Sequence, residues 1–326
     1  MKNYGLKLLT NYADLWNITN QRNTEVLWAV NYSTNLAVNG GTSNQGHSMV
    51  LMEYNTLPGM TRDVANGLAN VLYMPTRFLL NLFNETDDAR SSGSFKLAWI
   101  ANNTATIPKW TAAEAAQNAA LTPVVGQAKF AVGDTAIFIT KQNIYDFQRN
   151  YSNRYRYKTY DINDVYNSNG TPKDRFHYIS LKKFDEPARA SATETQSSYD
   201  AYLIRLAEMY LVAAEARFKL NKLDSAAYFV NEVRKRVALP GRQVAIQITP
   251  AMVTLDFLLD ERAREFAGEQ LRWFDLRRTG KLVERVKVDN PDAAAYIQDF
   301  HALRPIAHAQ IDAVTNKSEF KQNPGY

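Results

Sequence analysis

The sequence predicts a mostly α-helical fold, in which tetratricopeptide-like helical pairs pack against a loop-rich region with short β-strands. In the second half, apolar residues recur at helical spacing in two neighbouring segments. The connection between them around Asn221 is very short, so the two helices must pack antiparallel. In the first half, short apolar segments alternate with polar, glycine-containing stretches. We therefore expect two regions, a loop-rich one at residues 1–198 and a helical one at residues 199–326.

The start of the chain predicts a helix followed by a strand. Residues 4–16 carry apolar side chains on one face of a helix. Residues 25–33 alternate and are rich in Val, Trp and Tyr, which predicts a strand with Trp28 in the core. Residues 58–84 have an irregular helical pattern, and Pro75 suits the first turn of a helix within it.

The middle of the chain predicts short strands around one exposed helix. The strands are expected at residues 94–100, 128–140 and 178–184. Between the first two, Thr111 and Glu114 have the spacing of a capping box, which predicts a short helix in an Ala- and Asn-rich segment.

The second half predicts three successive helices. The first begins near residue 199 and has the apolar stripe Leu203, Leu206, Ala207, Tyr210, Ala214 and Phe218. The second has the stripe Leu223, Ala226, Ala227, Val230, Val233 and Val237. Thr249 and Pro250 predict the start of the third, which we expect to continue over residues 255–282, with Gly280 as a C-cap glycine near its end.

Composition excludes several classes of function. The 326 residues carry 38 basic and 33 acidic side chains, a net charge of +5, without any long basic run, so we expect no nucleic-acid partner. The lack of cysteine excludes disulfides, cysteine zinc ligands and cysteine nucleophiles. No apolar run approaches the ~20 residues of a membrane-spanning helix.

Charged residues crowd the third helix, in the order Asp260, Glu261, Arg262, Arg264, Glu265 and Glu269. Two carboxylates one turn apart could flank a glycosidic bond, as in a glycosidase. Ion pairs at i,i+3 and i,i+4 explain the same spacing, and we favour them. We therefore predict no catalytic residues. Farther along, Asp275 should pair with a neighbouring arginine, and Trp273, Phe274 and Leu276 should form a buried anchor.

No metal or cofactor is predicted. The four histidines, His47, His177, His301 and His308, do not have the spacing of a metal motif. Residues 86–90 and 161–170 are rich in Asp and Asn oxygens, so a structural calcium ion stays possible there. Neither segment fits the EF-hand pattern, and we interpret both first as ordinary turns.

Aromatic residues in polar surroundings point to a ligand. They include Tyr54, Trp99, Trp110, Tyr145, Tyr151, Tyr155, Tyr157, Tyr160 and Tyr166. A sugar ring offers C–H groups to a flat aromatic face and hydroxyls to Asn, Gln, Arg or Asp. We predict a binding site that includes Trp99, Trp110, Tyr54, Asn102 and Tyr155. The alternative for each of these aromatic residues is a place in the core.

Three ordered motifs near the end of the chain resemble one family. They are DERAREFAGEQLRWFDLRRTGK at residues 260–281, LRPI at 303–306 and QNPGY at 322–326. Together they resemble the C-terminal region of the SusD/RagB family, the cell-surface glycan-binding lipoproteins of Bacteroidetes. The likeness is strongest over residues 199–326 and weaker over 4–90. Ala307 and Gln310 depart from the family pattern at a local turn.

The resemblance implies a non-catalytic protein at the cell surface of the outer membrane. It would bind an oligosaccharide or polysaccharide for uptake through a SusC-like TonB-dependent transporter. Such proteins carry a signal peptide and a lipid anchor, and this chain shows neither, so we expect an N-terminally truncated member. Two alternatives stay open: a helical-repeat scaffold that binds only protein, and the binding of a non-sugar nutrient such as peptide.

Overall fold

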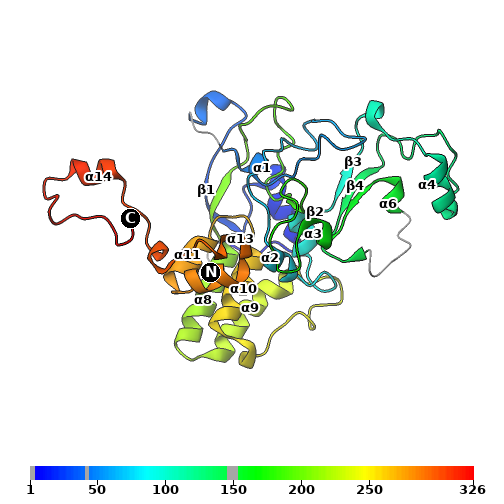
Figure 1. Cartoon of the computed structure of the whole chain (residues 1–326). Coiled ribbons are helices and arrows are strands. Elements are labelled where there is room, and N and C mark those ends of the chain that lie inside the picture. Colours follow the sequence, from blue (N-terminus) through cyan, green and yellow to red (C-terminus); the bar gives the residue numbers. More distant parts are fainter. Residues whose placement is uncertain (1–3, 41–43, 145–152) are drawn as a thin grey trace.

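The computed structural model describes residues 4–40, 44–144 and 153–326. Long helices gather in one part of the molecule, and the short strands and loops form the other (Figure 1). The C-terminal segment forms an arm that carries α14 (His308–Ala313) and extends away from the body (Figure 1). The predicted class, helix-rich with a few short strands, is confirmed.

The predicted helical pair is α8 (Leu206–Lys219) and α9 (Leu223–Val237), which pack against one another. Small and branched side chains fill the contact, among them Ala207, Leu211, Ala214, Ala226, Val230 and Val233. Asn221 makes the reversal in the left-handed region, with φ 55°, which Asn tolerates better than most residues. The next helix, α10 (Leu255–Glu265), packs on α8.

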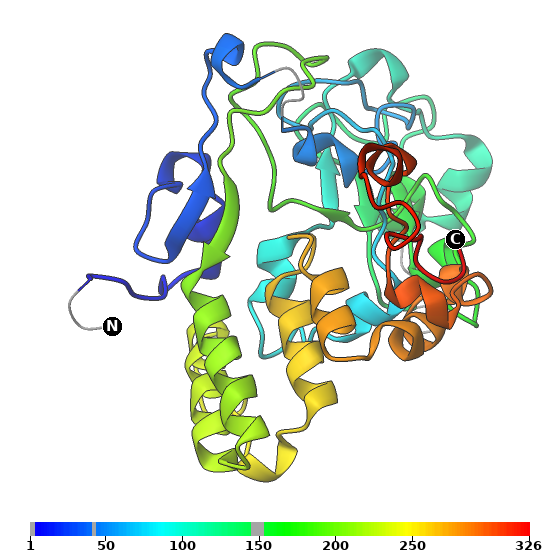
Figure 2. The same ribbon diagram turned by 90° about the vertical axis from the view of Figure 1, so that its left-hand side faces the viewer.

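A strand precedes this pair where the sequence predicts helix. Residues Ala201–Arg205 form β7, which pairs antiparallel with β1 (Val26–Val30), and β7 leads directly into α8 (Figure 2). The expected start of the first helix near residue 199 is therefore wrong. The Tyr, Leu and Ile of β7 also suit a strand, and β1 supplies the ladder partner that a local pattern cannot reveal.

The expected helix at residues 4–16 is shorter than its pattern. It is a single 3₁₀ segment, η1 (Tyr12–Trp16), capped by the Asn11 side chain. The preceding amides bond elsewhere: Lys7 N donates to Thr24 O at 3.1 Å, and Leu9 N donates to Glu25 Oε2 at 3.0 Å. Because these donors are engaged outside the segment, no helical ladder forms there.

The third helix is broken rather than continuous. It is replaced by α10, α11 (Arg272–Arg278) and α12 (Leu282–Asp289). Gly268 has φ 79°, and a Cβ at this position would lie 2.6 Å from Leu181 Cδ1, so glycine is required. Its start also differs, because Thr254 rather than Thr249 caps the helix. The expected C-cap glycine is confirmed, since Gly280 follows α11 with φ 71°.

The strands and short elements of the first half surround the largest apolar core. The three-stranded sheet has the order β3 (Ala98–Ile100), β4 (Thr135–Ile139) and β5 (Lys158–Tyr160), with an antiparallel and then a parallel pair. A second pair joins β2 (Phe95–Lys96) to β6 (Ser180–Leu181).

The short α-helices along the chain are α1 (Gly46–Met49), α2 (Arg77–Asn81), α3 (Arg90–Ser94), α4 (Ala112–Gln117), α6 (Asn153–Arg156), α7 (Ile162–Val165) and α13 (Pro291–Ala294). The remaining 3₁₀ segments are η2 (Ile18–Asn20), η3 (Leu36–Val38), η4 (Thr104–Thr106), η5 (Ala119–Leu121), η6 (Pro250–Met252) and η7 (Asp299–Ala302).

Local signals in this half are confirmed where they are strong. The Thr111–Glu114 capping box is formed at the start of α4. The helix expected near residue 75 exists as α2, but Thr76 caps it and Pro75 lies just before the cap rather than in the first turn.

A network of buried charges joins the two halves. Arg90, with no exposed side-chain area, binds Asp88 at 2.7 Å, Glu261 at 2.9 Å and Glu265 at 3.2 Å. Arg205 binds Glu25 at 2.9 Å and Glu265 at 3.1 Å. The remaining members are Arg236 on Glu25 and Glu265, Lys183 and Arg205 on Glu269, and Arg234 and Arg264 on Glu261. These contacts cross the expected boundary at residue 198.

The carboxylates of α10 are therefore ion-paired, as favoured from the sequence. Most of their partners are distant in sequence, and only Arg264 pairs with Glu261 at i,i+3. Burial alone would raise the pKa of Glu265, but Arg236, Arg205 and Arg90 outweigh it and lower the pKa to about 2. The pKa of Glu261 is lowered in the same way by Arg90, Arg234 and Arg264.

The motif after α10 is confirmed in part. Asp275 pairs with Arg262 at 2.6 Å and with Arg278 at 2.9 Å. Leu276 is buried and Trp273 is half-buried, but Phe274 is 64% exposed, which corrects its place in the expected anchor.

The two last motifs close the C-terminal arm on itself. Gln322 Nε2 donates to Ile306 O at 2.8 Å, and Ile306 N donates to Gln322 Oε1 at 2.7 Å. The rings of Phe300 and Tyr326 meet edge to face at 5.0 Å. The LRPI and QNPGY segments are thus two sides of one loop.

We expect Glu265→Gln to lower the free energy of unfolding at pH 7 by about 3–5 kcal/mol, because it leaves buried guanidinium groups without their counter-charge. The pKa of Glu265 is lowered in the folded state, so its contribution is full above about pH 4.5 and is lost as the pH falls toward about 2. Urea unfolding at a series of pH values measures both effects. In acid, the slope of the unfolding free energy against pH gives the number of protons taken up on unfolding. In the variant this number should be smaller than in the parent by up to one. Glu284→Gln, which removes an exposed pair with Lys281, is the control and should change little. Equal losses in the two variants would contradict the importance of the network.

Candidate functional site

An exposed tryptophan on β1 marks the candidate site. The indole of Trp28 is 61% exposed, and neighbouring Leu27 is 38% exposed. The pairing of β1 with β7 shifts register on both sides of Trp28, so a bulge interrupts the alternation of faces. Two successive side chains therefore face solvent, which corrects the expectation that Trp28 lies in the core.

A shallow, open cleft of about 430 Å³ lies beside this ring. Its apolar lining comes from β1 and includes Trp28. Its polar lining consists of Gln21, Arg22, Asn23, Asn31 and Asp200. An aromatic face thus lies beside amide, guanidinium and carboxylate groups.

Several polar atoms of this lining have no hydrogen bond to the described residues, although Asp200 itself is only 5% exposed. Asp200 N donates to Gln21 Oε1, and Asp200 Oδ1 accepts from Tyr32 N at 2.8 Å, which fixes the carboxylate. Its Oδ2 has no hydrogen bond to the described residues, and neither do the side chains of Arg22 and Asn31. By contrast, the Asn23 amide is engaged with Asn20 O and Glu25 N. The cleft therefore offers an anchored acceptor and two kinds of unengaged donor.

The predicted site residues Tyr54 and Trp99 lie together, but in the core. Their rings stack at 4.4 Å, and neither side chain is exposed. Lys96 Nζ covers the Trp99 ring at 3.9 Å from its centroid. Burial raises the pKa of Tyr54 to about 12, and its hydroxyl donates to Gly67 O. The expectation that these two rings are open to a ligand is corrected, because the core occupies their faces.

The other three predicted residues are separate from this pair. Trp110 is 7% exposed, with Lys129 Nζ at 5.1 Å from its ring. The Asn102 amide is engaged with Thr61 N, Thr61 O and Asp63 and so holds the loop at residues 61–63. Tyr155 is half-buried on α6, and ligand binding by Trp110 and Tyr155 stays a prediction. Tyr145 and Tyr151 lie outside the described residues.

The oxygen-rich segments proposed for calcium serve as turns and caps. Asp88 binds Arg90, and Asp161 caps α7 through Asn163 N and Asp164 N. Within residues 4–40, 44–144 and 153–326, no group of three or more His, Asp or Glu side chains is placed to hold a metal ion. A structural calcium ion stays a prediction. In the same part of the chain, every helix is too short or too polar to cross a bilayer.

Sequence comparison finds one family over almost all of the chain. The model of the SusD family matches residues 24–326. SusD-like protein P25 of Formosa agariphila is 24% identical over 326 residues, covering 98% of this chain and 52% of that protein. SusD-like protein P38 of the same organism is 38% identical over 89 residues, covering 25% of this chain and 17% of that protein. The chain thus spans about half the length of the first of these curated relatives.

Solved structures share the fold. Surface glycan-binding protein A from Bacteroides fluxus has a TM-score of 0.55 at 16% identity, covering 100% of this chain and 56% of that chain. Its counterpart from Bacteroides uniformis has a TM-score of 0.52 at 19% identity, covering 99% of this chain and 54% of that chain. B. fragilis NanU has a TM-score of 0.55 at 16% identity and covers 100% of this chain and 56% of that chain.

We expect Trp28→Phe to remove most of the acrylamide-quenchable tryptophan emission. The chain has five tryptophans. Trp16, Trp99 and Trp110 are buried and Trp273 is half-buried, so Trp28 is the ring that a quencher reaches most easily. Stern–Volmer plots of fluorescence measure this. Trp110→Phe is the matched control and should leave the quenching slope unchanged. An unchanged slope in Trp28→Phe would show that β1 is covered in solution.

Proposed function

Because this chain belongs to the SusD family, we propose that it is a non-catalytic cell-surface protein that binds an oligosaccharide for uptake through a TonB-dependent outer-membrane transporter. The observation that carries the sugar-binding part is the exposed indole of Trp28 beside the polar lining of its cleft. Structural neighbours named as surface glycan-binding proteins support the same class. Association with the transporter and location at the outer membrane rest on the family.

The cleft has the chemistry that a sugar ring requires. The C–H face of a pyranose would cover the indole of Trp28, which replaces water by apolar contact. Equatorial hydroxyls would donate to the free Oδ2 of Asp200 and accept from Asn31 and Arg22. Because Asp200 is already oriented by its bond from Tyr32 N, little side-chain entropy is lost when it binds a hydroxyl.

The state of the α10 carboxylates argues against these two groups acting as a glycosidase pair. A glycosidase needs a protonated carboxylic acid with a raised pKa beside a second carboxylate. On α10 the opposite holds: the pKa of Glu265 is lowered to about 2, and that of Glu261 is also lowered. Both side chains are buried and bound to arginines, so neither is available to protonate a leaving group.

We expect Trp28→Ala to weaken the binding of a cognate oligosaccharide by about 1–3 kcal/mol, or about 5- to 150-fold, through loss of the stacking surface. Binding is measured by calorimetry and by Trp fluorescence against a panel of soluble glycans, with peptides as a second panel. Tyr228→Ala is the control, since Tyr228 is 57% exposed on α9 and does not line the cleft.

Equal loss in the two variants, or binding of a glycan that Trp28→Ala leaves unchanged, would contradict the site. A saturable response to peptides and to no glycan would contradict the sugar assignment. Release of reducing sugar during incubation with the bound glycan would contradict the non-catalytic role.

A further inference from the structure

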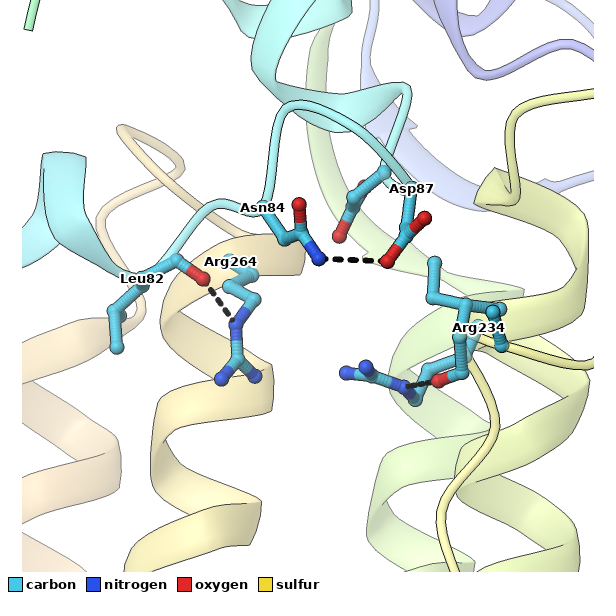
Figure 3. A pocket seen from close by; sticks show the side chains of 8 residues that line it. Leu82, Asn84, Asp87, Arg234 and Arg264 are labelled. Atoms are coloured by element: carbon cyan, nitrogen blue, oxygen red, sulfur yellow. Dashed lines mark hydrogen bonds between the residues drawn. The ribbon is translucent and has the colours of Figure 1, made fainter. Parts of the chain in front are cut away.

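A second, smaller pocket of about 160 Å³ lies where the turn after α2 faces α9 and α10 (Figure 3). This volume far exceeds the ~10–15 Å³ that one water molecule needs. Arg234 of α9 and Arg264 of α10 line one wall. Asn84, Asp87 and Asp88 line the other. The pocket is separate from the Trp28 cleft, with which it shares no residue.

Hydrogen bonds hold the two arginine side chains in place and leave one nitrogen of each guanidinium group without a partner among the described residues. Arg234 Nε donates to Ile246 O at 2.5 Å, and Arg264 Nε donates to Leu82 O at 2.9 Å. Each Nη1 binds Glu261 Oε2 at 2.6 Å. The two Nη2 groups have no partner among the described residues. Figure 3 shows the guanidinium group of Arg234 extending toward that of Arg264.

Positive charge is in excess at this wall. The single carboxylate of Glu261 is shared by Arg90, Arg234 and Arg264. Neither Arg234 nor Arg264 has another carboxylate partner among the described residues. Burial, with repulsion from Arg90 and Arg234, lowers the pKa of Arg264 despite the attraction of Glu261. The arginine side chains are 16% and 14% exposed, so a small solute can reach them.

Each carboxylate of the opposite wall already has an arginine partner. Asp88 is bound to Arg90 at 2.7 Å. Asp87 is bound to Arg242 at 3.2 Å and accepts from Asn84 Nδ2 at 2.7 Å. These two carboxylates therefore offer little attraction for a cation, whereas the opposite wall keeps unfilled donors.

We propose that this pocket binds one small oxyanion, a carboxylate or a sulfate group, between the Nη2 groups of Arg234 and Arg264. Fixed guanidinium forks bind oxyanions with charge-assisted, directional hydrogen bonds. The oxyanion would come either as a free ion or as a substituent of a sugar. This proposal does not depend on sugar binding at the Trp28 cleft.

The test is calorimetric titration of the chain with sodium sulfate, acetate and glucuronate, each at the same ionic strength set with sodium chloride. We expect saturable binding of at least one of them. Sulfate or acetate binding alone would indicate a free ion, and tighter binding of glucuronate than of acetate would indicate a sugar substituent. Absence of saturable binding of all three would overturn the proposal.

Variants separate this site from general charge attraction. Arg264→Lys keeps the charge and can still pair with Glu261 but lacks the second fork nitrogen, so it should bind about tenfold more weakly. Arg285→Lys is the matched control, because Arg285 is 11% exposed and multiply ion-paired on α12, outside the pocket, and it should bind as the parent does. Equal affinity of Arg264→Lys and the parent would overturn the proposal.

A variant that is expected to bind more tightly excludes misfolding as the explanation of the result. Asp87→Asn removes a negative charge from the opposite wall while an amide oxygen can still accept from Asn84. It should bind the oxyanion more tightly than the parent, a result that lost structure cannot produce. Weaker or unchanged binding by Asp87→Asn, with circular dichroism matching that of the parent, would contradict the placement of the anion.

Discussion

The fold depends on charges that are removed from water and must therefore find each other. Glu261 and Glu265 are fully buried, as is Arg90, and Arg205 is nearly so. An ion buried alone costs several kcal/mol, and removing one partner of a buried pair leaves that cost uncompensated. The partners come from points far apart in the chain, so the network forms only when both halves are assembled. The network therefore favours one packing of α10 on the first half of the chain and disfavours other packings.

The same network controls the geometry of the candidate site. Glu25 immediately precedes β1, and Arg205 ends β7, and these two side chains bind one another at 2.9 Å. Their ion pair lies beside the Val26–Arg205 register position and so anchors one end of the two-stranded ribbon. With that end held, the bulge at Trp28 is a fixed feature rather than a slippage of the ladder. The register that exposes the indole is therefore held at one end by a buried ion pair.

The sequence predicts local structure well and long-range choices poorly. The helical pair, the Thr111 cap and the glycine after α11 follow from signals a few residues long, and each is confirmed. The strand β7 was predicted as helix, because its residues share the apolar spacing of α8 and its partner β1 lies far away in sequence. The same limit hides the bulge: alternation predicts a buried Trp28, and only the register with β7 shows otherwise.

The contrast between Trp99 and Trp28 explains why site residues were harder to predict than fold. Both lie on strands, and sequence context assigned them the wrong way round, with Trp28 in the core and Trp99 at the site. Trp99 stacks on Tyr54 and also has Lys96 over its ring, which gives the ring the contacts that a core requires. Trp28 lacks such cover and shares its surface with exposed Leu27 and Val30. A single exposed apolar side chain is ordinary, but several together with a polar rim are typical of a surface that binds something.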